Sequence, residues 1–77
     1  MKEVTIYSTA TCHYCQLAKA YFKEHNVPYT EYNVGEDTEK RKEMVELTGQ
    51  LGVPVIRVGD TVLVGFQEKM VADLLAA

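Results

Sequence analysis

The sequence predicts an α/β fold, a four-stranded mixed sheet with three helices in the order strand, helix, strand, helix, hairpin, helix. Three observations predict it. Short runs alternate apolar and polar residues, the segments between them carry helical apolar spacing, and Gly59-Asp60 joins two strand-like runs. With 77 residues, the chain has enough apolar surface for one small core, so residues 1–77 are expected to form a single domain.

The first strand and the first helix are expected on either side of a short loop. Val4 and Ile6 alternate with more polar neighbours in a strand that ends near Ser8, and Thr11 is the expected helix cap. The helix is expected to end near Asn26. Its predicted apolar face has helical spacing and consists of Tyr14, Leu17, Ala18, Tyr21 and Phe22.

The rest of the chain predicts a strand, a helix, a hairpin and a final helix. Residues 29–34 are rich in tyrosine and alternate like a strand. The following helix has Met44 and Leu47 as its apolar stripe, and Gly49 is expected to end it in a left-handed cap. Residues 53–58 and 61–64 predict an antiparallel hairpin. After it, the apolar spacing of a helix returns and can cover the sheet.

Composition and charge exclude several classes of function. The chain is 47% hydrophobic and 25% charged, which is ordinary for a soluble protein, and no apolar run approaches the length of a membrane span. The net charge is -3 and the basic residues are scattered, so neither nucleic acid nor membrane is an expected partner. The first residues lack a signal-peptide pattern, and a cytoplasmic monomer is expected.

Cys12 and Cys15 are the only cysteines, and they lie at the junction of the first strand and the first helix. Unpaired N–H groups and the macrodipole at a helix start favour thiolate over thiol. The helical repeat returns Cys15 to the face of Cys12, close enough for a disulfide. We therefore expect Cys12 to attack and Cys15 to resolve the mixed disulfide, while His13 and Tyr14 tune the pair.

Plainer explanations exist for the two cysteines. A structural disulfide between them would close too short a loop to constrain the unfolded chain much. A structural zinc ion needs four ligands, and the only added imidazoles are His13, between the cysteines, and His25, about three helical turns away. No metal site is expected, although a carrier that shares an iron–sulfur cluster between two copies stays open as an alternative.

Pro54 opens a strand-like run and has two explanations. A strand start alone accounts for a proline that cannot donate to the ladder. Beside a helix that carries two cysteines, the sharper hypothesis is a cis Val53–Pro54 bond that presents the Val53 backbone to a bound thiol or peptide. Phe66 is either ordinary core or, after the permissive Gly65, part of the same binding site.

The three motifs Cys12-His13-Tyr14-Cys15, Gly52-Val53-Pro54 and Gly65-Phe66 together resemble the glutaredoxin-like branch of the thioredoxin superfamily, over essentially the whole chain. The resemblance implies a thioredoxin fold and a protein-disulfide oxidoreductase with no bound cofactor, whose partners are disulfide-containing proteins. It implies that Cys12 is the nucleophile, Cys15 the resolving thiol and Pro54 the cis-proline. The expected thiol or substrate site comprises Thr11, His13, Tyr14, Val53, Pro54, Gly65, Phe66 and Gln67.

The resemblance leaves two electron donors open. Glutaredoxins that use glutathione commonly carry a basic residue before the first cysteine, Thr-Val-Pro, and an acidic residue after Gly-Gly; this chain has Thr9, Gly52 and Gln67 there. Gly65-Phe66 is similar to NrdH-type redoxins, which take electrons from NADPH through thioredoxin reductase and pass them to ribonucleotide reductase. The dipeptide between the cysteines is closer to that of glutaredoxins. We expect thioredoxin reductase rather than glutathione as the reductant.

Overall fold

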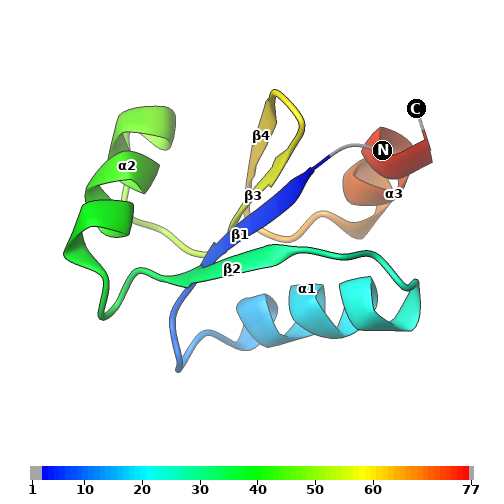
Figure 1. Cartoon of the computed structure of the whole chain (residues 1–77), viewed down its shortest axis with the longest axis horizontal. Coiled ribbons are helices and arrows are strands. Elements are labelled where there is room, and N and C mark those ends of the chain that lie inside the picture. Colours follow the sequence, from blue (N-terminus) through cyan, green and yellow to red (C-terminus); the bar gives the residue numbers. More distant parts are fainter. Residues whose placement is uncertain (1–2, 77) are drawn as a thin grey trace.

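The computed structural model describes residues 3–76 and confirms the predicted order of elements (Figure 1). The strands are β1 (Val4–Ser8), β2 (Thr30–Asn33), β3 (Val55–Val58) and β4 (Thr61–Val64). The helices are α1 (His13–Glu24), α2 (Thr38–Thr48) and α3 (Glu68–Ala76). No helix in residues 3–76 has the length and apolar character needed to cross a membrane.

The four strands form one mixed sheet in the order β2-β1-β3-β4. β1 pairs in parallel with β2, as expected for two strands joined by a helix, and antiparallel with β3. β3 and β4 form the predicted hairpin around Gly59, whose φ is +59°. Because Tyr7 of β1 pairs with Val55 of β3, the loop that leaves β1 and the segment that enters β3 meet at the same end of these two central strands.

Helices cover both faces of this sheet. Val4 and Ile6 of β1 pack with Phe22 of α1 and Val71 of α3 on one face. On the other face, Tyr7 packs with buried residues that include Met44 of α2. This alternation along β1 is the period-two pattern of a strand that is buried on both sides. The helix that begins at the cysteines therefore rests on the core of the α1–α3 face.

The start of α1 differs from the prediction, whereas its end agrees with it. Cys12, not Thr11, is the N-cap, because its sulfur accepts the N–H of Cys15. The helix ends at Glu24 with His25 as its C-cap, close to the predicted end near Asn26, whose backbone has a φ of +56°. Ordinary N-caps are oxygen-bearing side chains, so a cysteine cap is not signalled by the usual capping preferences.

The buried stripes of α1 and α2 are narrower than predicted. In α1 the buried residues are Cys15, Ala18 and Phe22. Tyr14 and Leu17 each precede one of these by a single residue, which turns them about 100° around the helix, and they are 61% and 42% exposed. In α2 the predicted stripe is only half right, because Met44 is buried whereas Leu47 is 40% exposed. Gly49 ends α2 with a φ of +73°, as predicted.

Candidate active site

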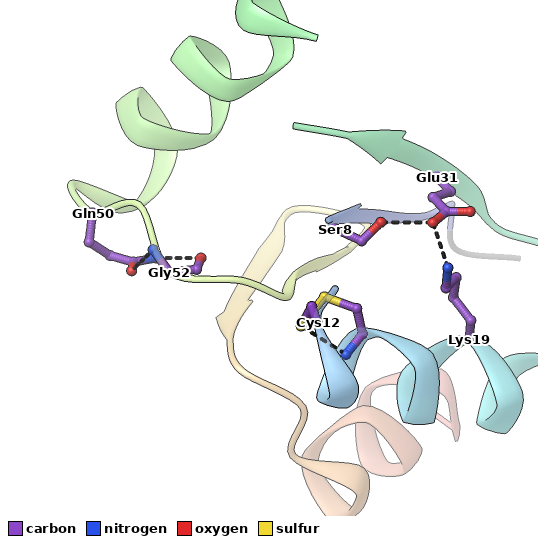
Figure 2. Close-up of a disulfide and its surroundings, with 7 residues drawn as sticks. Ser8, Cys12, Lys19, Glu31, Gln50 and Gly52 are labelled. Atoms are coloured by element: carbon purple, nitrogen blue, oxygen red, sulfur yellow. Dashed lines mark hydrogen bonds and ion pairs between the residues drawn. A yellow bond between two sulfur atoms is a disulfide. The ribbon is translucent and has the colours of Figure 1, made fainter. Parts of the chain in front are cut away.

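Cys12 and Cys15 form a disulfide at the start of α1 (Figure 2). Their Cα atoms lie 5.2 Å apart, and the N–H of Cys15 donates to the Cys12 sulfur at 3.1 Å. Cys15 is completely buried, whereas Cys12 is partly exposed. A sulfur that is reached from solvent and faces helix N–H groups is the one whose anion is better stabilised and more accessible.

The loop before the disulfide places Thr11 and the dipeptide between the cysteines on the surface. The N–H of Cys12 donates to the carbonyl of Thr9 at 3.4 Å, which folds the loop back toward β1. Thr11 is exposed and does not cap the helix. His13 and Tyr14 are also exposed, and their rings meet edge to face with centroids 5.8 Å apart. All three residues are thus exposed and flank Cys12 in the sequence or follow it into α1.

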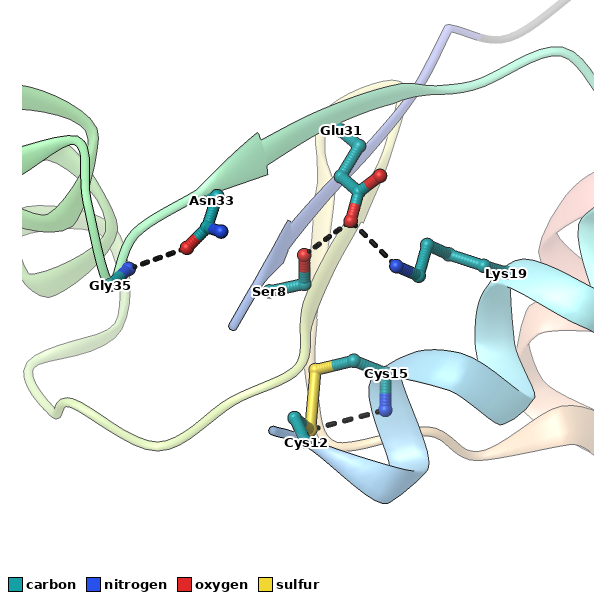
Figure 3. Close-up of polar contacts among 7 residues, drawn as sticks. All are labelled: Ser8, Cys12, Cys15, Lys19, Glu31, Asn33 and Gly35. Atoms are coloured by element: carbon teal, nitrogen blue, oxygen red, sulfur yellow. Dashed lines mark hydrogen bonds and ion pairs between the residues drawn. A yellow bond between two sulfur atoms is a disulfide. The ribbon is translucent and has the colours of Figure 1, made fainter. Parts of the chain in front are cut away.

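The segment that enters β3 lies beside the disulfide. The Val53–Pro54 bond is cis, as the sequence led us to expect, and Pro54 is buried. In Figures 2 and 3 the chain from Gly52 into β3 passes next to the sulfur pair. The carbonyl of Pro54 accepts the N–H of Gly65 at 2.8 Å. The structure therefore brings three of the predicted segments together, the cysteine loop, residues 53–54 and Gly65.

The residues after β4 contribute unequally to this region. Gly65 has a φ of +86°, which favours glycine, and open space lies where a Cβ would be. Phe66 is half-buried and packs against Tyr21 of α1 with ring centroids 5.8 Å apart, so it contributes to core packing. Gln67 is exposed, and its side-chain amide donates to the carbonyl of Val64 at 3.2 Å.

A side chain that the sequence did not single out covers Gly52. The amide nitrogen of Gln50 donates to the Gly52 carbonyl at 3.2 Å, and the N–H of Gly52 donates to the Gln50 amide oxygen. Both backbone groups of Gly52 are thus paired within the chain (Figure 2). A Cβ on Gly52 would collide with the Gln50 amide, so the threonine usual in Thr-Val-Pro would displace this side chain.

A second polar group near the dithiol was also not predicted. Ser8 is 1% exposed, and its hydroxyl donates to Oε2 of Glu31 at 2.7 Å. The Lys19 ammonium donates to the same oxygen at 2.8 Å (Figure 3). The hydrogen bonds from Lys19 and then Ser8 lower the pKa of Glu31. In the sequence, this polar group is indicated only by Ser8. The alternation of Val4 and Ile6 predicts a core residue at this strand position, and a polar residue stands there instead.

Within residues 3–76, no three side chains of histidine, cysteine, aspartate or glutamate gather in a way that could hold a metal ion. A vicinal cysteine pair at a helix start can exchange between dithiol and disulfide.

Comparisons with known proteins agree with this geometry. Residues 4–63 match the glutaredoxin family model. The chain is 39% identical over 72 residues to an uncharacterized glutaredoxin-like 8.6 kDa protein in the rubredoxin operon of Clostridium pasteurianum, over 94% of this chain and 96% of the relative. It is 32% identical over 71 residues to the glutaredoxin-like protein NrdH of Lactococcus lactis subsp. cremoris, over 92% and 97% of the two chains.

The solved structure of the glutaredoxin-like NrdH-redoxin from Escherichia coli superposes with a TM-score of 0.81 at 26% identity, over 94% of this chain and 93% of that one. The glutaredoxin from Archaeoglobus fulgidus superposes with a TM-score of 0.88 and, at 22% identity, shares the fold. The thioredoxin fold predicted from the sequence is confirmed. The chain belongs to the glutaredoxin family of thiol–disulfide oxidoreductases.

Proposed function

We propose that this protein reduces disulfides of other proteins by a cycle in which Cys12 attacks and Cys15 resolves. The observation that carries the assignment is the inequality of the two sulfurs. Cys12 is partly exposed and accepts the N–H of Cys15, whereas Cys15 is buried. Only an exposed sulfur can meet the disulfide of a large partner, and a hydrogen bond to it favours its thiolate form.

The proposed cycle transfers two electrons. The Cys12 thiolate attacks one sulfur of the substrate disulfide, and a mixed disulfide forms as the other substrate sulfur leaves as a thiolate. The Cys15 sulfur, after losing its proton, attacks the Cys12 sulfur and releases the second substrate thiolate. The substrate gains two electrons and, overall, two protons, and the chain is left with the disulfide seen in the structure. No bound cofactor is needed, because the two sulfurs carry the electrons.

We propose NADPH, through thioredoxin reductase, as the source of electrons and ribonucleotide reductase as one acceptor, in the reducing cytoplasm. Two features support this proposal. The positions where glutathione-dependent glutaredoxins commonly carry charge hold Thr9 and Gln67, and the Gln67 amide is hydrogen-bonded to the chain itself. Curated relatives that the chain resembles over nearly their whole length include a protein named NrdH. Glutathione is the alternative donor.

Two coupled assays test the donor. Turnover of a disulfide substrate is measured with NADPH and thioredoxin reductase, and separately with NADPH, glutathione reductase and glutathione. We expect faster turnover with thioredoxin reductase; faster turnover with glutathione would refute the proposed donor. As a matched comparison, the double variant Thr9→Lys and Gln67→Asp restores the missing charges and is expected to gain turnover with glutathione only.

A further inference from the structure

The Glu31 carboxylate is bonded to segments on both sides of the cysteine pair. Its Oε2 atom accepts the Ser8 hydroxyl at 2.7 Å and the Lys19 ammonium at 2.8 Å. Ser8 ends β1, four residues before Cys12, and Lys19 lies on α1, four residues after Cys15. One oxygen atom of β2 therefore joins the strand that leads into the cysteine loop to the helix that leads out of it.

We propose that Glu31 is a positioning residue for the dithiol, and that its Oε2 bridge holds the cysteine loop in the arrangement from which the two sulfurs react. This inference rests on the proposed cycle of Cys12 and Cys15 but not on the choice of electron donor. It concerns residues outside the expected thiol or substrate site. Glu31 touches neither sulfur in any hydrogen bond, so its effect is carried through Ser8 and Lys19.

The two donors of the bridge are better shielded from water than its acceptor. Ser8 is 1% exposed and the Lys19 side chain 17%, whereas the Glu31 side chain is 37% exposed, so the Ser8 hydroxyl is the partner for which water competes least. Hydrogen bonds to an ionised carboxylate are shorter and stronger than bonds between neutral groups. Ser8 also anchors β2 through its carbonyl, which accepts the N–H of Val34 at 2.8 Å. The end of β1 is thus fixed by both its side chain and its backbone.

Positioning matters for this reaction because its second step is intramolecular. Cys15 attacks the sulfur of Cys12 in the mixed disulfide. The rate of this step depends on how often the Cys15 sulfur lies in line with the bond between Cys12 and the substrate sulfur. A loop whose two ends are held spends more time in that arrangement. Loss of the bridge should slow the step without removing either reacting group.

The chain contains a matched control on the opposite face of the same sheet. Glu43 of α2 accepts the hydroxyl of Tyr7, the neighbour of Ser8, at 2.7 Å, and the Lys40 ammonium at 3.2 Å. This second carboxylate has the same kinds of partner but lies on the α2 face, away from the helix of the cysteines. Glu31→Ala and Glu43→Ala therefore change the net charge equally and each remove one such bridge.

The test uses the full chain, reduced with dithiothreitol that is then removed, in a single-turnover stopped-flow reaction with insulin whose disulfides are intact, beside thermal unfolding of each variant. We expect Glu31→Ala to be slower by about fivefold, the factor that corresponds to the net value of one hydrogen bond, with Glu43→Ala within about twofold of the parent chain. Glu31→Gln keeps one oxygen that can accept both donors and, because bonds to a neutral amide are weaker, is expected to recover part of the rate.

Two results would overturn the inference. Equal rates for Glu31→Ala and Glu43→Ala would mean that the bridge has no bearing on the dithiol. A Glu31→Gln rate as low as that of Glu31→Ala would mean that the charge, and not the positioning, matters. Failure of the proposed cycle is distinguishable, because it would appear in the unmodified chain as faster alkylation of Cys15 than of Cys12.

Discussion

At the scale of single residues, Cys12 and Cys15 carry the same side chain in unequal surroundings. Cys12 caps α1 and is partly exposed, while Cys15 begins the buried stripe of the helix. The Cys15 N–H that points at the Cys12 sulfur favours a negative charge there. One position therefore suits attack on a partner, and the other suits a reaction that occurs only inside the molecule.

Single replacements of the two cysteines should give different products. Cys12→Ser is expected to reduce disulfide reductase activity to the background rate, because no other thiol is exposed. Cys15→Ser is expected to keep the first attack and accumulate the mixed disulfide, because no second sulfur remains to release it. Mass spectrometry of the protein after incubation with an oxidised substrate measures the adduct. An adduct on the Cys12→Ser variant would reverse the assignment.

Tyr7 should ionise unusually late. Its burial, followed by the hydrogen bond to Glu43, raises the pKa of Tyr7 to about 12. The folded pKa lies above the ordinary value of 10, so the stability that protonated Tyr7 contributes is complete below pH 10 and is lost as the pH rises toward 12. The difference in phenolate absorbance between the parent chain and Tyr7→Phe should appear near pH 12. A difference that titrates near pH 10 would contradict this environment.

The residue patterns predicted the pair of cysteines but not the hydrogen-bonded bridge beside it. Cys12, Cys15 and Pro54 were identified because their chemistry is readable from residue type and spacing. The bridge of Ser8, Glu31 and Lys19 joins three elements distant in the sequence, and its existence depends on strand register and side-chain rotamers. Local patterns contain neither quantity.

At the scale of elements, α2 is capped at both ends and has Met44 as its buried residue. Asp37 accepts the N–H of Lys40 at 3.0 Å at the start, and Gly49 ends the helix in the left-handed region. Both ends were foreseeable, because acidic residues precede the helix and a glycine follows it. The start of α1 was not, because Thr11 satisfied the same capping rules and lay one residue too early.

Replacement of Gly49 should cost stability through the backbone alone. Nothing lies within 4 Å of a Cβ at this position, so Gly49→Ala introduces no collision but places a side chain at a φ of +73°. The expected loss is about 1 kcal/mol in the free energy of unfolding, measured with urea. Gly49→Asn should lose less, because asparagine tolerates this conformation better. An unchanged stability of the alanine variant would contradict the cap.

The attachment of α2 to the sheet should weaken in acid. The hydrogen bonds from Tyr7 and then Lys40 lower the pKa of Glu43 below its ordinary value of 4.5. A group with a lowered folded pKa stabilises the protein above the unfolded pKa, and this contribution is lost as the pH falls through the folded pKa. Urea unfolding between about pH 5 and pH 3 should show a shallower loss of stability in Glu43→Gln than in the parent chain. Equal slopes would show that the pair is not coupled to folding.

At the scale of the whole molecule, the antiparallel pairing of β1 with β3 assembles the site. The cysteine loop follows β1 and the Val53–Pro54 bond precedes β3, so the register that pairs Tyr7 with Val55 sets them side by side. The βαβ unit and the hairpin followed from local patterns. No local pattern predicted that β1 and β3 are neighbours, because pairing between distant strands leaves no local signature.

The most direct test of this account is a competition between the two thiols. The reduced protein is treated with less than one equivalent of iodoacetamide at neutral pH, and the alkylated peptides are counted by mass spectrometry. We expect most of the label on Cys12, the partly exposed cap of α1, and little on buried Cys15. Faster labelling of Cys15 would contradict it.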